Sequence, residues 1–148
     1  MKNRIALFLV AMMAIVEGGF VRAAPPAAEC PQPRFTGKAP DEYYNRTNPL
    51  ATGAQDSAAA RRIFMGRGNS ISCATCHGEK GDGRGEMSDQ FNPRPRNFTC
   101  ALTIDGVPDG QLFWIIRFGS PGTSMPPHRE LSDEQVWQLV AYLRHLAK

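Results

Sequence analysis

Cys73-Ala74-Thr75-Cys76-His77 is the stretch of sequence that decides the fold. It has the pattern C-x-x-C-H, which is an attachment motif for a c-type haem. The spacing places both thiols on one face of a helical turn, where they can reach the two vinyl groups of one porphyrin. The adjacent imidazole is a candidate proximal ligand of the iron. The sequence therefore predicts one covalently bound haem c, attached at Cys73 and Cys76 and ligated by His77.

Two other uses of paired cysteines fit the sequence less well. A C-x-x-C pair also serves as a thioredoxin-like redox motif, but no βαβ pattern surrounds this one. A pair can also form half of a zinc site, but Cys30 and Cys100 lie 70 residues apart and form no second knuckle. Haem attachment is the use that agrees with the following histidine.

Residues 1–23 have the features of a secretory signal peptide. Two basic residues precede an apolar run from Ile5 to Val16, and Val21-Arg22-Ala23 is a small-x-small cleavage site. The run has twelve residues, fewer than the roughly 20 that span a bilayer, although an uncleaved anchor is the alternative. We expect cleavage after about Ala23, a periplasmic location, and no membrane span in the mature chain.

The composition of the mature chain argues against one class of partner. Removing the signal takes three basic residues and one acidic residue from totals of 17 and 14, and leaves 14 and 13. A net charge of +1 does not favour a nucleic-acid binder that relies on bulk charge, so no nucleic-acid partner is expected. The remaining 125 of 148 residues suffice for about one domain of ~150 residues. We expect a Pro/Ala-rich extended arm over residues 24–55 and a domain over residues 56–148.

Periodic apolar residues predict three helices in that domain and no strand. The first is capped by Asp56-Ser57 and runs to about Gly66, and the second runs from a cap at Asp109 to Gly119. In the third, Ser132 and Gln135 form a capping-box pattern, and apolar residues recur with helical spacing. The fold class is all-α. Because the connections are long and rich in loop residues, something besides side chains must fill the middle.

The sixth position of the iron has several candidate ligands. Met125 lies 48 residues after His77 in an irregular segment stiffened by prolines, which can lay a side chain against the opposite haem face. His128 is its rival. Met65 is expected to pack in the core, and Met87 lies too close to the motif in sequence to cross the porphyrin easily. His145 is expected at the surface of the last helix. The sequence favours Met125.

From about Ala59 onward the chain resembles the monohaem class I c-type cytochromes of the bacterial periplasm. The haem pentapeptide is specific, and the block Pro121-Gly122-Thr123-Ser124-Met125-Pro126 is specific once the pentapeptide is present. The other matching blocks are Ala60-Arg61-Arg62-Ile63-Phe64, Asn92-Pro93-Arg94-Pro95-Arg96-Asn97-Phe98, Gly110-Gln111-Leu112-Phe113-Trp114-Ile115-Ile116 and Leu131 to Arg144.

The resemblance implies a cytochrome c-like fold of three to five helices around one haem. It implies axial ligation by His77 and Met125 and a crossing of the first and last helices, where Ala60 replaces the glycine usual in the family. It also implies that a proline carbonyl, of Pro93 or Pro95, accepts the Nδ1 proton of the proximal histidine. Haem propionates are expected near three candidate residues, which could equally be loop charges and a core aromatic: Arg94, Arg96 and Trp114.

If both axial positions are filled, no substrate binds the iron, and the protein is expected to carry one electron without catalysing a reaction. Its partners would be redox proteins such as a periplasmic dehydrogenase, reductase or terminal oxidase. The alternative is a haem-containing enzyme, or an electron-transfer subunit of a periplasmic oxidoreductase complex, with a displaceable distal ligand.

Cys30 and Cys100 are left over once the haem takes the other two cysteines. In an oxidising compartment we expect them to form a disulfide that pins the arm to the domain. Two free buried thiols are the alternative.

Overall fold

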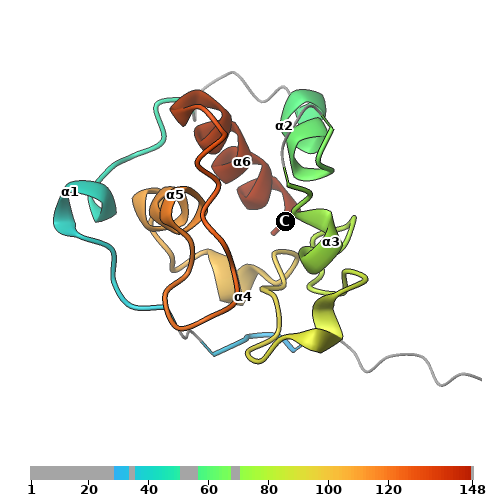
Figure 1. Ribbon diagram of the computed structural model, residues 1–148. Coiled ribbons are helices and arrows are strands. Elements are labelled where there is room, and N and C mark those ends of the chain that lie inside the picture. Colours follow the sequence, from blue (N-terminus) through green and yellow to red (C-terminus); the bar gives the residue numbers. More distant parts are fainter. Residues whose placement is uncertain (1–28, 34–35, 51–56, 68–70, 148) are drawn as a thin grey trace, which may run out of the picture.

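A computed structural model describes residues 29–33, 36–50, 57–67 and 71–147, and these ranges contain helices and no strand (Figure 1). The longer helices are α2 (Ser57–Phe64), α5 (Asp109–Phe118) and α6 (Asp133–Leu146). Single turns form α1 (Asp41–Tyr44), α3 (Ala74–His77), α4 (Ala101–Ile104) and the 3₁₀ turn η1 (Ser88–Gln90). The all-α prediction is confirmed. The expected signal segment and the expected cap at Asp56 lie outside the described residues.

Helix α2 ends where the sequence predicts. The amide of Gly66 donates to the Ile63 carbonyl, and the amide of Arg67 donates to the Arg62 carbonyl. These are the two bonds of a Schellman motif, which requires a left-handed residue at the first position after the helix. Gly66 fills that position with a φ of 71°.

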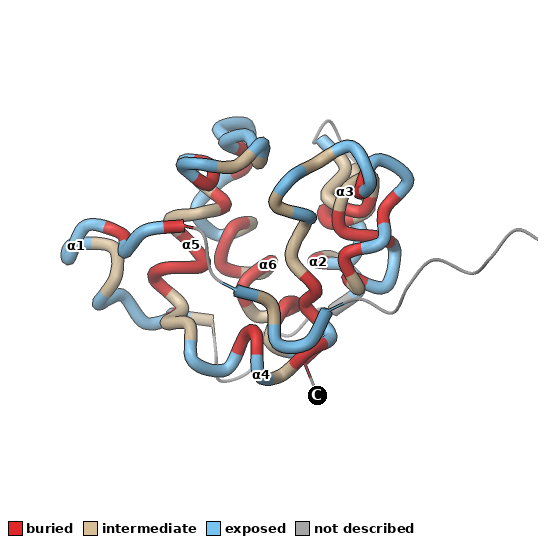
Figure 2. Tube along the Cα trace, turned by 90° about the horizontal axis from the view of Figure 1, so that it is seen from below, coloured by how far each residue is buried: buried red, intermediate tan, exposed pale blue. Residues whose placement is uncertain are grey.

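Helix α6 begins with the predicted capping box and packs against both other long helices. The Ser132 hydroxyl accepts from the Gln135 amide, and the Gln135 side chain accepts from the Ser132 amide. Its buried face contacts α2 and α5, with buried stretches of α5 and α6 in the middle of the molecule (Figure 2). Phe64 of α2 lies 5.5 Å from Tyr142 of α6 between ring centroids. The expected packing of first and last helices is confirmed, with Ala60 only 2% exposed in the same core cluster.

Helix α5 begins differently from the prediction. Asp109 is its first residue rather than its cap; the cap position is Pro108, which makes no side-chain hydrogen bond to the helix. The Asp109 carboxylate instead accepts two N–H bonds, at 2.9 and 2.8 Å, from Arg144 of α6. Arg144 also donates to the carbonyls of Ile104 and Val107. The carboxylate is therefore used to join two helices. The predicted end at Gly119 is confirmed, with a φ of 83°.

The described part of the arm lies against the domain. Its one helical turn, α1, packs on α5 at Gly110, where a Cβ would overlap the Tyr43 carbonyl oxygen. Buried Gln111 continues this contact by accepting from the Ala39 amide at 2.7 Å and donating to the Gly37 carbonyl at 3.1 Å. The close approach of α1 therefore requires a glycine on α5.

The C-terminal part of the described arm contacts α6 through Asn48, and its N-terminal part lies beside Cys100 through Cys30. The Asn48 side chain donates to the Trp137 carbonyl at 2.9 Å. Cys30 and Cys100 are placed as a disulfide pair with their Cα atoms 5.7 Å apart. Within the described ranges, none of the helices is both long enough and apolar enough to cross a bilayer.

Candidate functional site

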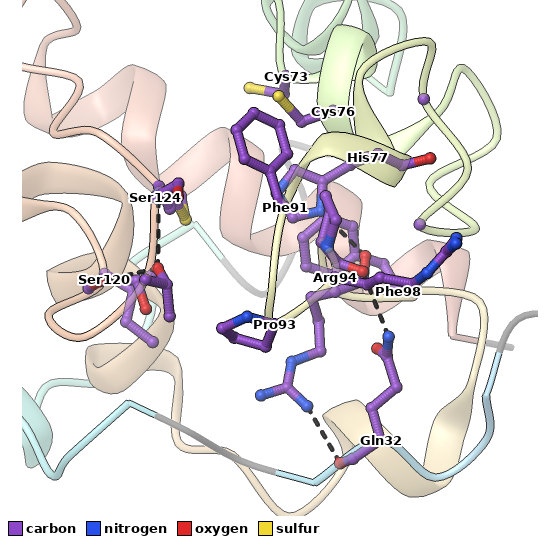
Figure 3. Close-up of a pocket in the computed structure, with 18 of the residues that line it drawn as sticks. Gln32, Cys73, Cys76, His77, Phe91, Pro93, Arg94, Phe98, Ser120 and Ser124 are labelled. Carbon is purple, nitrogen blue, oxygen red and sulfur yellow. Dashed lines mark hydrogen bonds between the residues drawn. The ribbon is translucent and has the colours of Figure 1, made fainter.

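The motif turn presents two thiols to one cavity. Cys73 precedes α3, Cys76 lies within it, and the amides of Cys76 and His77 both donate to the Cys73 carbonyl. Figure 3 shows the two sulfur atoms projecting toward the opposite wall, which carries Ser120 and Ser124. Burial raises the pKa of the Cys73 thiol to about 11 and also raises the pKa of Cys76. Both groups are therefore protonated thiols at neutral pH, and neither is in a disulfide.

His77 is buried, and one of its ring nitrogens is hydrogen-bonded to the protein backbone. Its Nδ1 lies 2.9 Å from the Arg96 carbonyl oxygen, and because a carbonyl only accepts, Nδ1 carries the proton. The ring stacks on Phe98 with centroids 4.5 Å apart. Burial lowers the pKa of His77 to about 4, so the imidazole is neutral. A neutral ring with Nδ1 protonated keeps its Nε2 lone pair available for a metal.

The partner of His77 corrects one expectation. The resemblance implied a carbonyl from Pro93 or Pro95, but the acceptor belongs to Arg96. The Pro95 carbonyl accepts from the Gln32 side chain instead, at 3.2 Å. Both prolines do line the cavity.

The loop after the motif contains Gly78, Gly81, Gly83 and Gly85, and it packs against the motif turn. The Gly83 amide donates to the His77 carbonyl at 2.8 Å, and the Gly85 amide donates to the Cys76 carbonyl at 3.1 Å. A Cβ on Gly85 would overlap the Thr75 carbonyl oxygen. This loop therefore packs against α3 at a distance that only glycine permits.

The cavity in front of the motif has a volume of about 770 Å³. That volume falls within the roughly 300–1,000 Å³ typical of cofactor and small-molecule sites. Cys73, Cys76, His77, Met125 and His128 all line it. Much of the remaining wall is apolar, including these side chains: Phe91, Phe98, Ile104, Leu112, Ile116 and Leu143.

Met125 reaches the cavity from a loop closed by its own hydrogen bonds. The Ser120 amide donates to the Met125 carbonyl at 3.2 Å, and the Met125 amide donates to the Thr123 hydroxyl at 3.2 Å. The Thr123 amide in turn donates to the Ser120 carbonyl at 3.0 Å. These bonds fix the backbone of Met125, whose side chain is half-buried.

The other candidate ligands occupy different surroundings. His128 also lines the cavity, but its Nδ1 lies 3.1 Å from a Glu130 carboxylate oxygen. Met65 packs against the hydrophobic core, as expected. Met87 is 36% exposed and is not among the residues lining the cavity, and His145 is exposed on α6. The choice of Met125 over His128 stays a prediction.

Of the three residues considered for the haem propionates, Arg94 and Arg96 line the cavity. The Arg94 guanidinium pairs with Asp89 at 2.7 Å, and both side chains are largely exposed. Arg96 donates to carbonyls of the arm, and Trp114 is not among the described residues that line the cavity. A role for any of the three toward propionates stays a prediction.

Sequence reasoning did not identify three residues that the structure brings to the site. Phe98 lies in a matching block but was not assigned to the His77 ring, which it stacks against. Gln32 and Thr36 of the arm line the same cavity. The position of Gln32 two residues after Cys30 is the only sequence signal that could have indicated it.

The donor set fits a c-type haem. Two thiols three residues apart suit covalent attachment, and a neutral imidazole with its Nδ1–H fixed suits axial ligation. A thioether and an apolar wall share the same cavity. In the described residues, no group of three His, Cys, Asp or Glu side chains is placed so that it could hold a metal ion.

Comparison with known families agrees with this chemistry. The family model described as "Cytochrome c" matches residues 57–147. The chain belongs to the cytochrome c family. Membership implies a covalently bound c-type haem and haem-based electron transfer.

The comparison with solved structures supports the fold alone, and the comparison with curated proteins gives no significant match. Among solved structures, the chain is similar to one from the reducing HAO-like protein complex of Kuenenia stuttgartiensis, with 24% identity and a TM-score of 0.56. The similarity covers 70% of this chain and 50% of that chain, so this cytochrome spans about half the length of its structural neighbour.

Proposed function

We propose that this cytochrome is a periplasmic one-electron carrier whose single haem is attached at Cys73 and Cys76 and ligated by His77 and Met125. The observation that carries the proposal is the cavity itself. A neutral, buried imidazole with its Nδ1–H fixed and a thioether on a separately closed loop line the same cavity as the two free thiols.

The haem and the residues around it would have distinct roles in this function. The haem supplies a reversible one-electron couple between ferrous and ferric iron. His77 is held in one tautomer by the Arg96 carbonyl, and Met125 is held by the loop that Ser120 closes. The apolar wall excludes water, which together with a thioether ligand favours the reduced state and raises the potential.

The proposed partners are periplasmic redox proteins such as a dehydrogenase, a reductase or a terminal oxidase. Such contacts are small and transient, and they need an accessible edge beside the redox centre. Ile71, which precedes the motif, lines the cavity and is 58% exposed. An exposed apolar side chain at this point supports docking next to the motif. The predicted signal peptide, with cleavage after about Ala23, supports the periplasmic location.

A second candidate function is a haem enzyme, or a redox subunit of an oxidoreductase complex, with a displaceable distal ligand. His128 is the observation that favours it. Its imidazole lines the cavity close to Met125 in the sequence, and its pairing with Glu130 resembles a distal acid–base group.

Spectroscopy of the purified holoprotein distinguishes the two functions. We expect the oxidised protein to show the weak far-red charge-transfer band of a methionine–iron bond, and the reduced protein to bind carbon monoxide poorly. Absence of that band together with rapid carbon monoxide binding would contradict the carrier and favour the enzyme.

A further inference from the structure

The side chain of Gln32 bridges the two peptide groups on either side of Arg96. Its Nε2 donates to the Pro95 carbonyl at 3.2 Å, and its Oε1 accepts from the Asn97 amide at 2.6 Å. Between these two bonds lies the Arg96 carbonyl that accepts the His77 proton. The Arg96 carbonyl and the Asn97 amide belong to one peptide group, so this arm side chain holds the peptide that orients the proximal histidine as well as the peptide before it.

The Arg96 side chain returns the contact to the arm. Its guanidinium donates to the Gln32 carbonyl at 3.2 Å and to the Pro33 carbonyl at 3.3 Å. Figure 3 shows Gln32 reaching from the arm toward the loop that carries Pro93 and Arg94. The backbone N–H of Gln32 also donates to the side-chain hydroxyl of Thr103 in α4, at 3.1 Å. At Gln32 and Pro33, the arm is therefore hydrogen-bonded both to the loop of Arg96 and to α4.

A second arm residue contacts the opposite wall of the cavity. The hydroxyls of Thr36 and Ser120 are hydrogen-bonded, and both residues are buried. The Ser120 amide donates to the Met125 carbonyl. The same stretch of arm therefore touches the supports of both candidate axial ligands.

We propose that Gln32 and Thr36 are positioning residues, which make the arm a clasp between the supports of His77 and Met125. The clasp is defined here as the described residues 29–33 and Thr36. The proposal rests on the ligation proposed above and deepens it. It assigns to the arm the task of setting the reduction potential and keeping the distal position closed.

The expected direction follows from the hydrogen bond to His77. A carbonyl held against Nδ1–H raises the basicity of the ligating imidazole, which stabilises ferric iron and lowers the potential. If the Arg96 peptide is released, that bond weakens and the potential rises. On the other wall, losing the Thr36 bond should let Met125 leave the iron more often.

The first test uses Gln32→Met, which keeps the length of the side chain but removes its amide group. In the holoprotein we expect a higher midpoint potential and faster exchange of the His77 Nδ1 proton, measured by NMR of the reduced state. The methionine charge-transfer band should remain. Gln32→Asn, whose amide is one methylene too short to span both peptides, should shift both readouts in the same direction. Unchanged potential and exchange in both variants would overturn the role of Gln32.

A matched control separates positioning from general loss of stability. Asn48→Ala removes an arm hydrogen bond to the Trp137 carbonyl but touches neither Arg96 nor Ser120. It should lower the melting temperature without changing the potential or the proton exchange. Equal shifts in Asn48→Ala and Gln32→Met, at equal loss of stability, would refute positioning.

The second test uses Thr36→Val, which removes the hydroxyl at nearly constant volume. Loss of one hydrogen bond corresponds to about a 2- to 12-fold rise in the population with Met125 detached. We expect the same increase in the rate of carbon monoxide binding to the reduced protein. Thr47→Val, at an exposed threonine of the same arm, should bind it as the wild type does. Equal rates in Thr36→Val and wild type would refute the distal half of the clasp.

The experiments distinguish failure of the proposed ligation from failure of the clasp. If the wild type lacks the methionine band, the proposed ligation fails, yet the His77 proton exchange still decides whether Gln32 positions Arg96. If the wild type shows the band and the variants change nothing, only the clasp fails.

Discussion

Removing the Cys30–Cys100 pair should cost this protein a large part of its stability. The two cysteines are separated by 70 residues, and a cross-link that closes such a loop lowers the entropy of the unfolded chain. The chain-entropy relation gives about 4 kcal/mol for a loop of that length. For the expected mature chain of 125 residues, that free energy corresponds to a fall of roughly 15 °C in melting temperature.

The assay compares thermal unfolding of the wild-type holoprotein with a Cys30→Ala, Cys100→Ala double variant of equal haem content. Substituting both cysteines avoids leaving one thiol free to form intermolecular bonds. The wild type should melt higher in the absence of reductant, and the difference should shrink when reductant is present. Mass spectrometry that finds both cysteines alkylated without prior reduction would refute the pairing. A double variant that melts within a few degrees of the wild type would refute the magnitude.

Three further predictions test the site and the packing of the arm. Met125→Ala should keep the haem attached but lose the charge-transfer band, lower the potential and bind carbon monoxide readily. His128→Ala should leave the band, the potential and carbon monoxide binding unchanged. The reverse pattern would make His128 the ligand. The Cys73→Ala, Cys76→Ala double variant should lose the haem and become sensitive to protease, because the 770 Å³ cavity then has nothing to fill it; a compact, resistant product would contradict this. Gly110→Ala should destabilise the protein by about 1–3 kcal/mol in denaturant unfolding, because its Cβ overlaps the backbone of α1; an unchanged midpoint would show that α1 can shift at no cost.

Those parts of the fold that rest on local chemistry could be predicted from the sequence. The capping box of Ser132 and Gln135 and the helix-ending Gly66 are encoded by residues close together in the chain, so pattern and structure agree. Asp109 shows the limit of this logic. Its carboxylate is suited to a helix cap, but Arg144 lies close enough in the folded protein to bind it instead.

The parts of the site that depend on distant backbone groups could not be predicted. The acceptor for His77 is a main-chain carbonyl, which every residue carries, so the sequence gives no means of choosing Arg96 over its neighbours. The same holds for Gln32, whose partners lie more than 60 residues away in the chain. Helix α1 is a single turn of four residues, too short for a periodic pattern to show.

The order of the cysteines along the chain has a consequence for biogenesis. If the chain is exported from its N-terminus, as proposed, Cys30 emerges first, the motif thiols follow from residue 73, 43 residues later, and Cys100 appears 24 residues after Cys76. Oxidation during export would therefore offer Cys30 two wrong partners before the right one arrives. Capture of the motif thiols by haem removes both competitors from the pool. Under the proposed export, correct maturation would then require haem attachment at Cys73 and Cys76 to precede disulfide formation at Cys30.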